Sequence, residues 1–439
     1  MKLQKLFFLP LFLFFLITSA HAQIDDTYFD YMDVFELQLV GNPEISPDGN
    51  TIIYQRNQFD VMTDRRFSNL WSISFSGKEH RPITSGKSNY GNVTWAPGGD
   101  RIAYTSSEEG SNQIFVHWMD TGASASITNL TESPGNLSWS PDGSKLLFSK
   151  FVPGSSSVVK AELPSPPEGA KWEEYRRDGG GYVEDGHSHI FVISAEGGAP
   201  RQLTSGNYDH GSPTWTPDGN ILFTADRSGN ADLDPNNEQI YEMNIETGAM
   251  TRITDKRGPH SNPVVSPDGT LIAYTGYKDE FLGYQLTDLY IMYREGSNLR
   301  KISQAVENDV SSIRWADDSR SLYFRYTEEG VAKVGNIKLN GDYTEIAQHL
   351  SSTTIGRPYS GGSYSVAKNG RFAFTSGTPT QPAELSVGHF PTRMSNQQLT
   401  NLNEQFLKSK ELGQVEQFWV NSSVDDFKIQ GWIITPPDF

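Results

Sequence analysis

The chain contains no cysteine, comparatively few cationic side chains, and no apolar run beyond its first residues that could cross a membrane. Without cysteine no disulfide can stabilise the fold, so a chain of 439 residues must rely on its hydrophobic core. Lysine and arginine number 36 against 53 aspartate and glutamate residues, which gives a net charge of −17. This deficit of positive charge disfavours nucleic acid and anionic membrane surfaces as partners.

The first 22 residues have the pattern of a secretory signal peptide. Lys2 and Lys5 precede an apolar run at 6–17, and Ala20-His21-Ala22 follows as a small-residue cleavage site. A transmembrane anchor is the alternative, but the run is shorter than the about 20 apolar residues that a spanning helix needs. We therefore expect a periplasmic or secreted protein that is cleaved after Ala22, with no lipid anchor and a mature net charge of −19.

The rest of the sequence repeats one short motif seven times. Proline at the first corner, an aspartate that can bond its own backbone, and a glycine that accepts positive φ are the residues of a tight β-turn. The last residues of successive copies are 50, 44, 76, 50, 50 and 51 residues apart. The copies are Ser46-Pro47-Asp48-Gly49, Ala96-Pro97-Gly98-Gly99, Ser140-Pro141-Asp142-Gly143, Thr216-Pro217-Asp218-Gly219, Ser266-Pro267-Asp268-Gly269, Ala316-Asp317-Asp318-Ser319 and Ala367-Lys368-Asn369-Gly370.

Each copy joins two predicted strands, and a second predicted hairpin follows it. An apolar or aromatic residue such as Trp95 often precedes the motif, and a β-rich run such as 101–104 follows it. Four strands in every ~50 residues are typical of a propeller blade. The sequence therefore predicts an all-β fold, a seven-bladed β-propeller of four-stranded blades over 23–402, with a leader helix at about 30–39. A β-sandwich is the alternative, but it would not repeat one four-strand phrase seven times.

Blade three is longer than the others, and its additional residues lie at about 151–187. This segment begins rich in proline and serine and continues with Trp172, a cluster of charges, and Gly179-Gly180-Gly181. A long loop on a rigid scaffold is usually functional or disordered, and the aromatic residues favour a structured one.

Together these features resemble the N-terminal propeller portion of the prolyl oligopeptidase family, in its bacterial branch of dipeptidyl and acylaminoacyl peptidases. The resemblance covers the mature chain: the leader helix, the seven turn motifs, the Gly-rich insertion, and an exit hairpin at 416–421 and 428–435 that contains Gln430-Gly431-Trp432. In that family this hairpin opens the α/β-hydrolase domain. The resemblance thus implies a peptide substrate, no cofactor, and a linker plus the start of a hydrolase domain at 403–439.

The catalytic part that the resemblance implies is missing. A serine hydrolase of this class needs a G-x-S-x-G nucleophile followed by aspartate and histidine, and the sequence has no such motif. The segments around Ser188 and Ser88 come nearest but lack the final glycine. We therefore predict no catalytic residue, expect the chain alone to be inactive, and interpret it as truncated, because an apolar two-stranded hairpin is marginal by itself.

In this family such propellers contact the end of the substrate, and the resemblance gives that role to the insertion. Acidic side chains would pair with a free amino terminus, and arginines with a carboxylate or an acyl carbonyl. The candidate substrate-binding residues are Glu173, Glu174, Tyr175, Arg176, Arg177 and Tyr182. The alternative is a solvated, charged loop. For the whole chain we favour the substrate-gating propeller of an exported serine exopeptidase, and the alternative is a free-standing periplasmic propeller that binds a protein or glycan.

Two further clusters are candidates for a metal site. An acidic group in blade four could supply oxygen ligands to Ca²⁺, but it lacks EF-hand spacing, so a plain acidic loop is favoured. Its members are Asp226, Asp232, Asp234, Asn236 and Glu238. His187, His189 and His210 lack a metal-ligand pattern. We therefore predict no metal.

Overall fold

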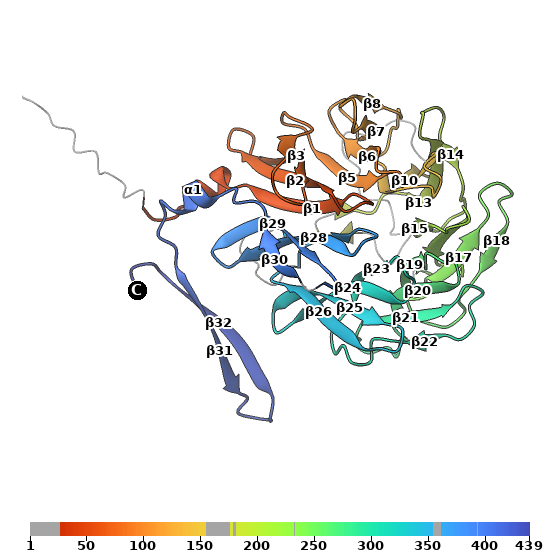
Figure 1. Cartoon of the computed structure of the whole chain (residues 1–439). Helices are drawn as coiled ribbons and strands as arrows, with labels where there is room; N and C mark the ends of the chain where they lie inside the picture. The colour runs from red at the N-terminus through yellow and green to blue at the C-terminus, as the bar shows by residue number, and fades with distance from the viewer. Residues whose placement is uncertain (1–26, 155–175, 179–180, 232, 354–360, 393) are drawn as a thin grey trace, which may run out of the picture.

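The structure is a computed structural model that describes residues 27–154, 176–178, 181–231, 233–353, 361–392 and 394–439. Seven antiparallel sheets of four strands each surround a common axis as the blades of a propeller (Figure 1). The first strand of each blade is innermost, and the first strands of neighbouring blades contact each other for most of the ring. The predicted all-β, seven-bladed propeller is confirmed.

Each blade takes its four strands from one contiguous segment of the chain. In order, these are β1 (Leu39–Ile45), β2 (Thr51–Asp60), β3 (Arg65–Ser74) and β4 (His80–Pro82); β5 (Tyr90–Trp95), β6 (Arg101–Ser106), β7 (Gln113–Trp118) and β8 (Ser124–Ser126); β9 (Gly135–Trp139), β10 (Lys145–Pro153), β13 (Gly186–Ser194) and β14 (Arg201–Gln202); β15 (Gly211–Trp215), β16 (Ile221–Ala225), β17 (Gln239–Met243) and β18 (Met250–Arg252); β19 (His260–Val265), β20 (Leu271–Gly276), β21 (Asp288–Tyr293) and β22 (Arg300–Lys301); β23 (Ser311–Trp315), β24 (Ser321–Glu328), β25 (Val331–Lys338) and β26 (Tyr343–Gln348); β27 (Tyr364–Val366), β28 (Arg371–Thr378), β29 (Gln381–His389) and β30 (Met394–Gln398). Outside the blades lie η1 (Asp33–Glu36), α1 (Glu404–Leu407), and the hairpins β11 (Arg176–Arg177) with β12 (Gly181–Tyr182) and β31 (Gln414–Asn421) with β32 (Lys428–Thr435).

The leader helix is shorter than predicted. Instead of a helix at about 30–39, the structure has the single 3-10 turn η1, and Leu39 already pairs with Asn57 as the first residue of β1. Strand pairing therefore takes the residues that would have continued the helix. No helix among the described residues is both long and apolar enough to cross a membrane.

The turn motifs close the first hairpin of each blade, as predicted. The fourth residue of each motif donates its backbone N–H to the carbonyl of the first, and its φ is positive in all seven blades, from 58° at Ser319 to 86° at Gly219. In the copies with a hydroxyl and an aspartate the side chains also bond, as at 2.5 Å from Ser46 Oγ to Asp48 Oδ1. The degenerate copies thus retain the backbone of the turn.

Tryptophans in front of the motif connect neighbouring blades. The indole Nε1–H of Trp95 donates to the carbonyl oxygen of Glu44 in blade one at 2.9 Å. Three other indoles make the same contact with the preceding strand: Trp139 with Thr94 O, Trp215 with Ser138 O and Trp315 with Val264 O. Because the apolar clusters also lie between adjacent sheets, as for Ile114 and Phe148 of blades two and three, the core of the molecule lies at the junctions.

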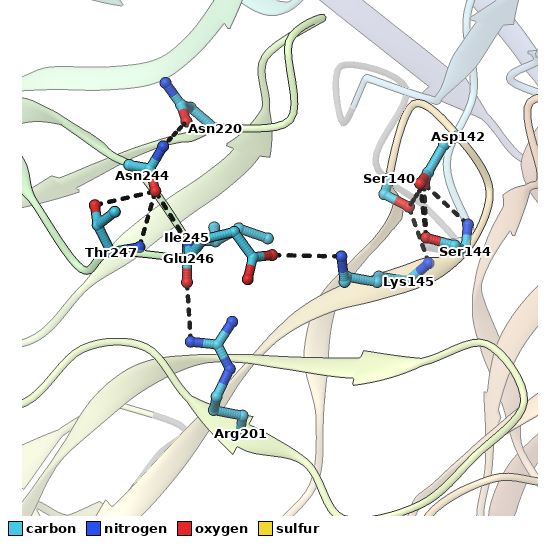
Figure 2. Close-up of polar contacts among 10 residues, drawn as sticks. All are labelled: Ser140, Asp142, Ser144, Lys145, Arg201, Asn220, Asn244, Ile245, Glu246 and Thr247. Carbon is cyan, nitrogen blue, oxygen red and sulfur yellow. Dashed lines mark hydrogen bonds and ion pairs between the residues drawn. The ribbon is translucent and has the colours of Figure 1, made fainter.

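Charged side chains bridge the outer parts of these junctions, as Figure 2 shows for blades three and four. Lys145 Nζ lies 3.5 Å from Glu246 Oε1, and Arg201 Nη1 donates to the carbonyl oxygen of Ile245 at 2.9 Å. Exposed ion pairs of this kind contribute little to stability.

The ring closes between blades seven and one without a shared strand. Two backbone N–H groups of β1 donate to serines of blade seven, Asn42 to Ser363 Oγ at 3.1 Å and Ile45 to Ser365 Oγ at 2.8 Å. Outside the sheets, Asn403 Oδ1 accepts from Gln38 N at 2.8 Å, and its Nδ2 donates to Gln38 O at 2.7 Å. Side-chain hydrogen bonds therefore connect the first and last blades, which exchange no strand.

Candidate functional site

The two faces of the propeller carry different connections. Because successive strands of a blade are antiparallel, the turn motifs and the third-to-fourth-strand turns lie on one face, which we call the turn face. The second-to-third-strand hairpins and the connections between blades lie on the other, the crossover face. β1 begins and β30 ends on the crossover face, so η1, α1 and the β31–β32 hairpin are attached to this face.

The blade-three insertion belongs to the crossover face, because it connects β10 to β13. Within it, Arg176 pairs with Tyr182 across the β11–β12 hairpin, and both are exposed. The candidates Glu173, Glu174 and Tyr175 lie outside the described residues, and Arg177 is described only by its backbone pairing with Gly181. Neither Arg176 nor Tyr182 lines the cavity described next, so the substrate-binding role of the insertion stays a prediction.

A cavity of about 800 Å³ lies at the axis, with a lining from blades one, two, three, six and seven. Crossover segments at 351–353 and 361–363 contribute to it, so it lies toward the crossover face. Most of its lining residues are glycine, serine, threonine, asparagine or glutamine. The cavity therefore offers mainly neutral hydrogen-bonding groups to a ligand.

A repeated segment of the innermost strands supplies part of this lining, through Asn42, Asn92, Asn136 and Ser312. In six blades an asparagine or serine adopts positive φ, between 42° and 53°, where the pairing of the first two strands is interrupted by an irregularity. These residues are Asn42, Asn92, Asn136, Ser212, Asn262 and Ser312. Asparagine tolerates this conformation better than most residues do. Three of the asparagine amides donate to hydroxyls of the next strand, as at 2.9 Å from Asn136 Nδ2 to Ser149 Oγ, whereas Asn42 Nδ2 donates to Gln55 Oε1.

The sequence contains a signal for this ring of asparagine and serine residues that the turn motif alone does not reveal. Each of these residues, and Ser363 in blade seven, lies four positions before the first residue of its turn motif and directly after glycine or serine. The constant spacing shows that this pair of residues is part of the blade repeat.

The charged residues of the cavity are three arginines and one glutamate: Arg66, Arg314, Arg325 and Glu44. Arg325 Nη1 donates to the carbonyl oxygens of Gly361 and Gly362, at 3.2 and 2.7 Å. Burial raises the pKa of the Glu44 carboxyl, and Arg314, whose Nη2 lies 3.5 Å from Glu44 Oε1, opposes this shift. The site is therefore polar, with an excess of positive charge.

The two serines considered as nucleophiles lie in different surroundings. Ser188 is in β13, where its backbone N–H donates to Asp209 Oδ1 at 2.7 Å. Ser88 precedes β5 and is half-buried. In the described part of the chain, no hydrogen bond connects either hydroxyl to an imidazole, so the geometry there supplies no serine–histidine pair.

The acidic loop of blade four is held by an arginine. Arg257 forms ion pairs with Asp234 and with Asp279, the latter at 3.1 Å. Asp232 lies outside the described residues, and across the described ranges no group of histidine, aspartate and glutamate has an arrangement suited to a metal ion. His189 and His210 do contact each other, with their Nδ1 atoms 3.2 Å apart, but both are buried.

Exposed apolar side chains gather on the crossover face. Within the described parts of the seven blades, Tyr293 is the exception on the turn face. The others lie in second-to-third-strand connections: Val61, Met62, Tyr182, Leu233, Phe281, Leu282 and Tyr284. These residues belong to the connections of blades one, three, four and five, so among the described residues the crossover face exposes more large apolar side chains than the turn face.

The β31–β32 hairpin also exposes large apolar side chains. It contacts blade six through Gln430, whose Nε2 donates to Glu329 O at 2.8 Å. The strand register places Phe418, Val420, Ile429 and Ile433 on one face of the hairpin, and each is between 38% and 53% exposed. An isolated hairpin with such a face is marginal in water and calls for a covering layer.

These features define a class of protein, the seven-bladed propeller with a polar axial cavity and one apolar face. The sequence profile of the family described as TolB beta propeller domain matches residues 34–168 and 181–284. The chain therefore belongs to the TolB-type β-propeller domain family.

Several peptidases are similar to the chain. The uncharacterized peptidase YuxL of Bacillus subtilis is 26% identical over 425 residues, which cover 92% of this chain and 63% of YuxL. The dipeptidyl-peptidase 5 of Porphyromonas gingivalis is 35% identical over 78 residues, 18% of this chain and 11% of that protein. The chain thus spans less than two thirds of the length of these relatives.

Solved structures agree on the fold. The acylaminoacyl peptidase of Pyrococcus horikoshii superposes with a TM-score of 0.72 at 16% identity, over 93% of this chain and 59% of that one. The propeller domain of the Trilobed protease from Pyrococcus furiosus gives a TM-score of 0.58 at 17% identity, over 84% of this chain and 97% of that one. The predicted resemblance to the propeller portion of prolyl oligopeptidase-type peptidases is confirmed.

Proposed function

We propose that the chain is the propeller portion of an exported serine exopeptidase of the dipeptidyl or acylaminoacyl type, and that it gates access to the catalytic site and binds one end of a peptide substrate. The observation that carries this proposal is the crossover face, because the exposed apolar side chains, the attachment of the β31–β32 hairpin and the opening segments of the axial cavity all belong to it. An α/β-hydrolase domain seated on this face would cover the apolar side chains. Its catalytic serine would then be near the cavity.

The β31–β32 hairpin is the first part of that domain in this proposal. Its uncovered apolar face would pack under the next strands or helices of the hydrolase, and Gln430 would anchor it to blade six. The names of the similar proteins, peptidase and dipeptidyl-peptidase, support a peptide as the substrate.

The decisive experiment uses the protein encoded by the complete reading frame beyond Phe439. We expect it to contain a G-x-S-x-G segment followed by aspartate and histidine, and to hydrolyse dipeptidyl or acyl-aminoacyl chromogenic substrates. Replacement of that serine by alanine should abolish turnover, and the 439-residue chain should be inactive. A reading frame that ends at Phe439, or an active 439-residue chain whose activity is lost in Ser188→Ala, would contradict the proposal and, in the first case, favour a free-standing binding propeller.

The exported location is tested separately. Fractionation should place the protein in the periplasm or medium, and N-terminal sequencing should begin at Gln23. Recovery of an intact Met1 from the cytoplasm would contradict export without affecting the proposed chemistry.

The blade-three insertion is proposed to select substrates by their charged ends. In the complete enzyme, replacing Glu173 and Glu174 by glutamine should lower kcat/KM for peptides with a free amino terminus much more than for blocked ones. Replacing Arg176 and Arg177 by glutamine should have the opposite preference. If both double variants match wild type on matched free and blocked peptides, the insertion is a solvated loop.

A further inference from the structure

The charges that line the axial cavity are opposite in sign to those of the chain. The cavity is lined by three arginines and one glutamate, whereas the whole sequence has 53 acidic and 36 basic residues. In a molecule with a net charge of −17, positive charges collected on a concave polar surface attract anionic groups that the rest of the surface repels.

The guanidinium groups retain hydrogen-bonding capacity. Arg325 bonds neutral partners, with Nε 3.2 Å from Ser311 Oγ in addition to its two carbonyl contacts. Arg66 Nη1 donates to Thr353 Oγ1 at 3.0 Å. Among the described residues, the sole carboxylate beside these arginines is Glu44, 3.5 Å from Arg314. Because each guanidinium has five N–H donors in a planar fork, donors remain for a ligand carboxylate.

We propose that the axial cavity is a binding site for peptides that carry a carboxylate, either the free carboxyl terminus or an acidic side chain. Arg66 and Arg314, whose side chains are exposed, bind the carboxylate, and Arg325 holds the adjoining loop by its carbonyl contacts. The choice of a peptide rests on the proposed function, whereas the need for a negative group follows from the cavity itself.

The neutral lining suits the rest of such a ligand. Asparagine and glutamine side chains both donate and accept, as backbone amides do, and Asn42, Asn92, Asn136 and Gln55 line the cavity. A volume of about 800 Å³ is within the range of small-ligand sites and admits a short peptide.

The test measures binding to the 439-residue chain, so no catalytic domain is needed. Three neutral-core pentapeptides with the same amino-terminal fluorophore are compared by anisotropy at low salt: one with a free carboxyl terminus, one amidated, and one amidated with a single glutamate. We expect the two peptides with a carboxylate to bind about tenfold more tightly than the neutral amide, and high salt to remove the difference.

Variants locate the site. Arg66→Gln and Arg314→Gln should each weaken binding of the two carboxylate peptides about tenfold and leave the neutral amide unchanged, and Arg314→Lys should retain part of the affinity. Arg81→Gln is the matched control, because Arg81 is exposed in β4 outside the cavity and its loss changes the net charge equally. Since both tested arginines are exposed, neither variant should prevent folding, which circular dichroism verifies.

Equal affinity for all three peptides overturns the proposal, as does an equal loss in Arg81→Gln, which would indicate a diffuse electrostatic effect. Unchanged binding in both cavity variants also overturns it, because the carboxylate would then bind elsewhere. Tighter binding of the peptide with a free carboxyl terminus than of the glutamate peptide would support the proposal and show that the cavity binds the carboxyl terminus. If the complete reading frame contains no catalytic domain, the proposed function fails while these binding measurements remain decisive.

Discussion

Two buried imidazoles make direct contact at the junction between blades three and four. His189 is 5% and His210 1% exposed, and their Nδ1 atoms are 3.2 Å apart. One nitrogen must donate and the other accept, so at least one of the two imidazoles is uncharged while the contact exists. Burial lowers the pKa of both imidazoles, to about 4 for His210, where the neighbouring His189 and Arg227 add to the effect.

This pair makes the fold sensitive to mild acid. An unfolded imidazole has a pKa of about 6.5. Between about pH 6.5 and pH 4, His210 is therefore protonated in the unfolded chain and uncharged in the folded one. The free energy of unfolding should therefore fall with pH in this window, by an amount on the order of 3 kcal/mol for His210. His210→Phe should reduce the difference between urea unfolding at pH 7.5 and at pH 4.5.

The matched control is His349→Asn, because His349 is exposed and asparagine tolerates its φ of 59°. Burial also lowers the pKa values of His80, His117 and His260, so some dependence will remain. An unchanged pH dependence in His210→Phe would contradict the prediction.

The turn aspartate Asp142 changes its charge at lower pH than the buried His210 does, because its pKa is lower. Asp142 accepts hydrogen bonds from Ser140 Oγ at 2.5 Å and from the backbone N–H of Ser144 at 3.0 Å, and these bonds lower its pKa to about 2. The stabilisation is present above the unfolded pKa of 3.8 and is lost as pH falls toward 2. Asp142→Asn should cost about 1 kcal/mol at pH 7 and less at pH 3.

Thermal unfolding at both pH values measures this effect. Asp64→Asn is the control, since Asp64 is exposed in a hairpin of the crossover face and its φ of 49° suits asparagine. Equal destabilisation of Asp142→Asn at pH 7 and pH 3 would show that the ionised form has no special role in the turn.

At the scale of elements, the β31–β32 hairpin has no buried residue in either strand. In this chain we expect its apolar face to promote self-association, and the double variant Val420→Thr, Ile429→Thr to reduce it, because threonine retains strand propensity without the apolar surface. Sedimentation velocity measures the change, and the melting temperature of the propeller should stay the same.

The complete protein should give the opposite result for stability. If the hairpin face is part of a hydrolase core there, the double variant should lower the melting temperature, because polar hydroxyls would be buried without partners. Val424→Thr at the exposed hairpin tip is the control in both proteins. Loss of propeller stability in the 439-residue chain would instead mean that the hairpin supports the blades.

The elements themselves were predictable because their signals are local. The turn motif and the alternation beside it fix four strands within one repeat, and even Ala316-Asp317-Asp318-Ser319 retains the turn. The leader helix was overestimated, because pairing of Leu39 with Asn57 depends on the neighbouring strand rather than on local residues. Strand order also places the insertion on the crossover face, an argument that the sequence alone already allowed.

The axial cavity was not predictable in the same way. Arg66 comes from blade one, whereas Arg314 and Arg325 come from blade six, and only closure of the ring brings them to one cavity. The asparagine and serine ring did have a sequence signal, at a fixed spacing before each turn motif. It was hidden because its residue types also occur in ordinary loops.

For the whole molecule, closure of the ring combines an apolar cluster shared by blades one and seven with a few buried polar side chains. Asn403 is 2% exposed and bonds both backbone groups of Gln38, and the buried Glu384 accepts from Leu402 N at 2.7 Å. Asn403→Ala should cost on the order of 1–3 kcal/mol, because polar groups of Gln38 lose their partners. Hydrogen exchange should increase most in blades one and seven.

Asn401→Ala is the control, since Asn401 is exposed on the same segment. If hydrogen exchange in Asn403→Ala increases uniformly around the ring, the junction between blades seven and one is no weaker than the other junctions.

Because the first and last blades share no strand, the fold does not require the chain to begin at blade one. Every blade is one contiguous segment, and the segments before β1 and after β30 already lie together, where Lys410 pairs with Asp33 at 2.9 Å and Tyr28 bridges to Glu411. A circular permutant that joins these segments and opens the chain between β22 and β23 would keep every sheet intact. The position at which a further domain is attached to the ring is therefore separable from the folding of the ring, and a propeller of this kind can present the same cavity from a chain that starts at any blade.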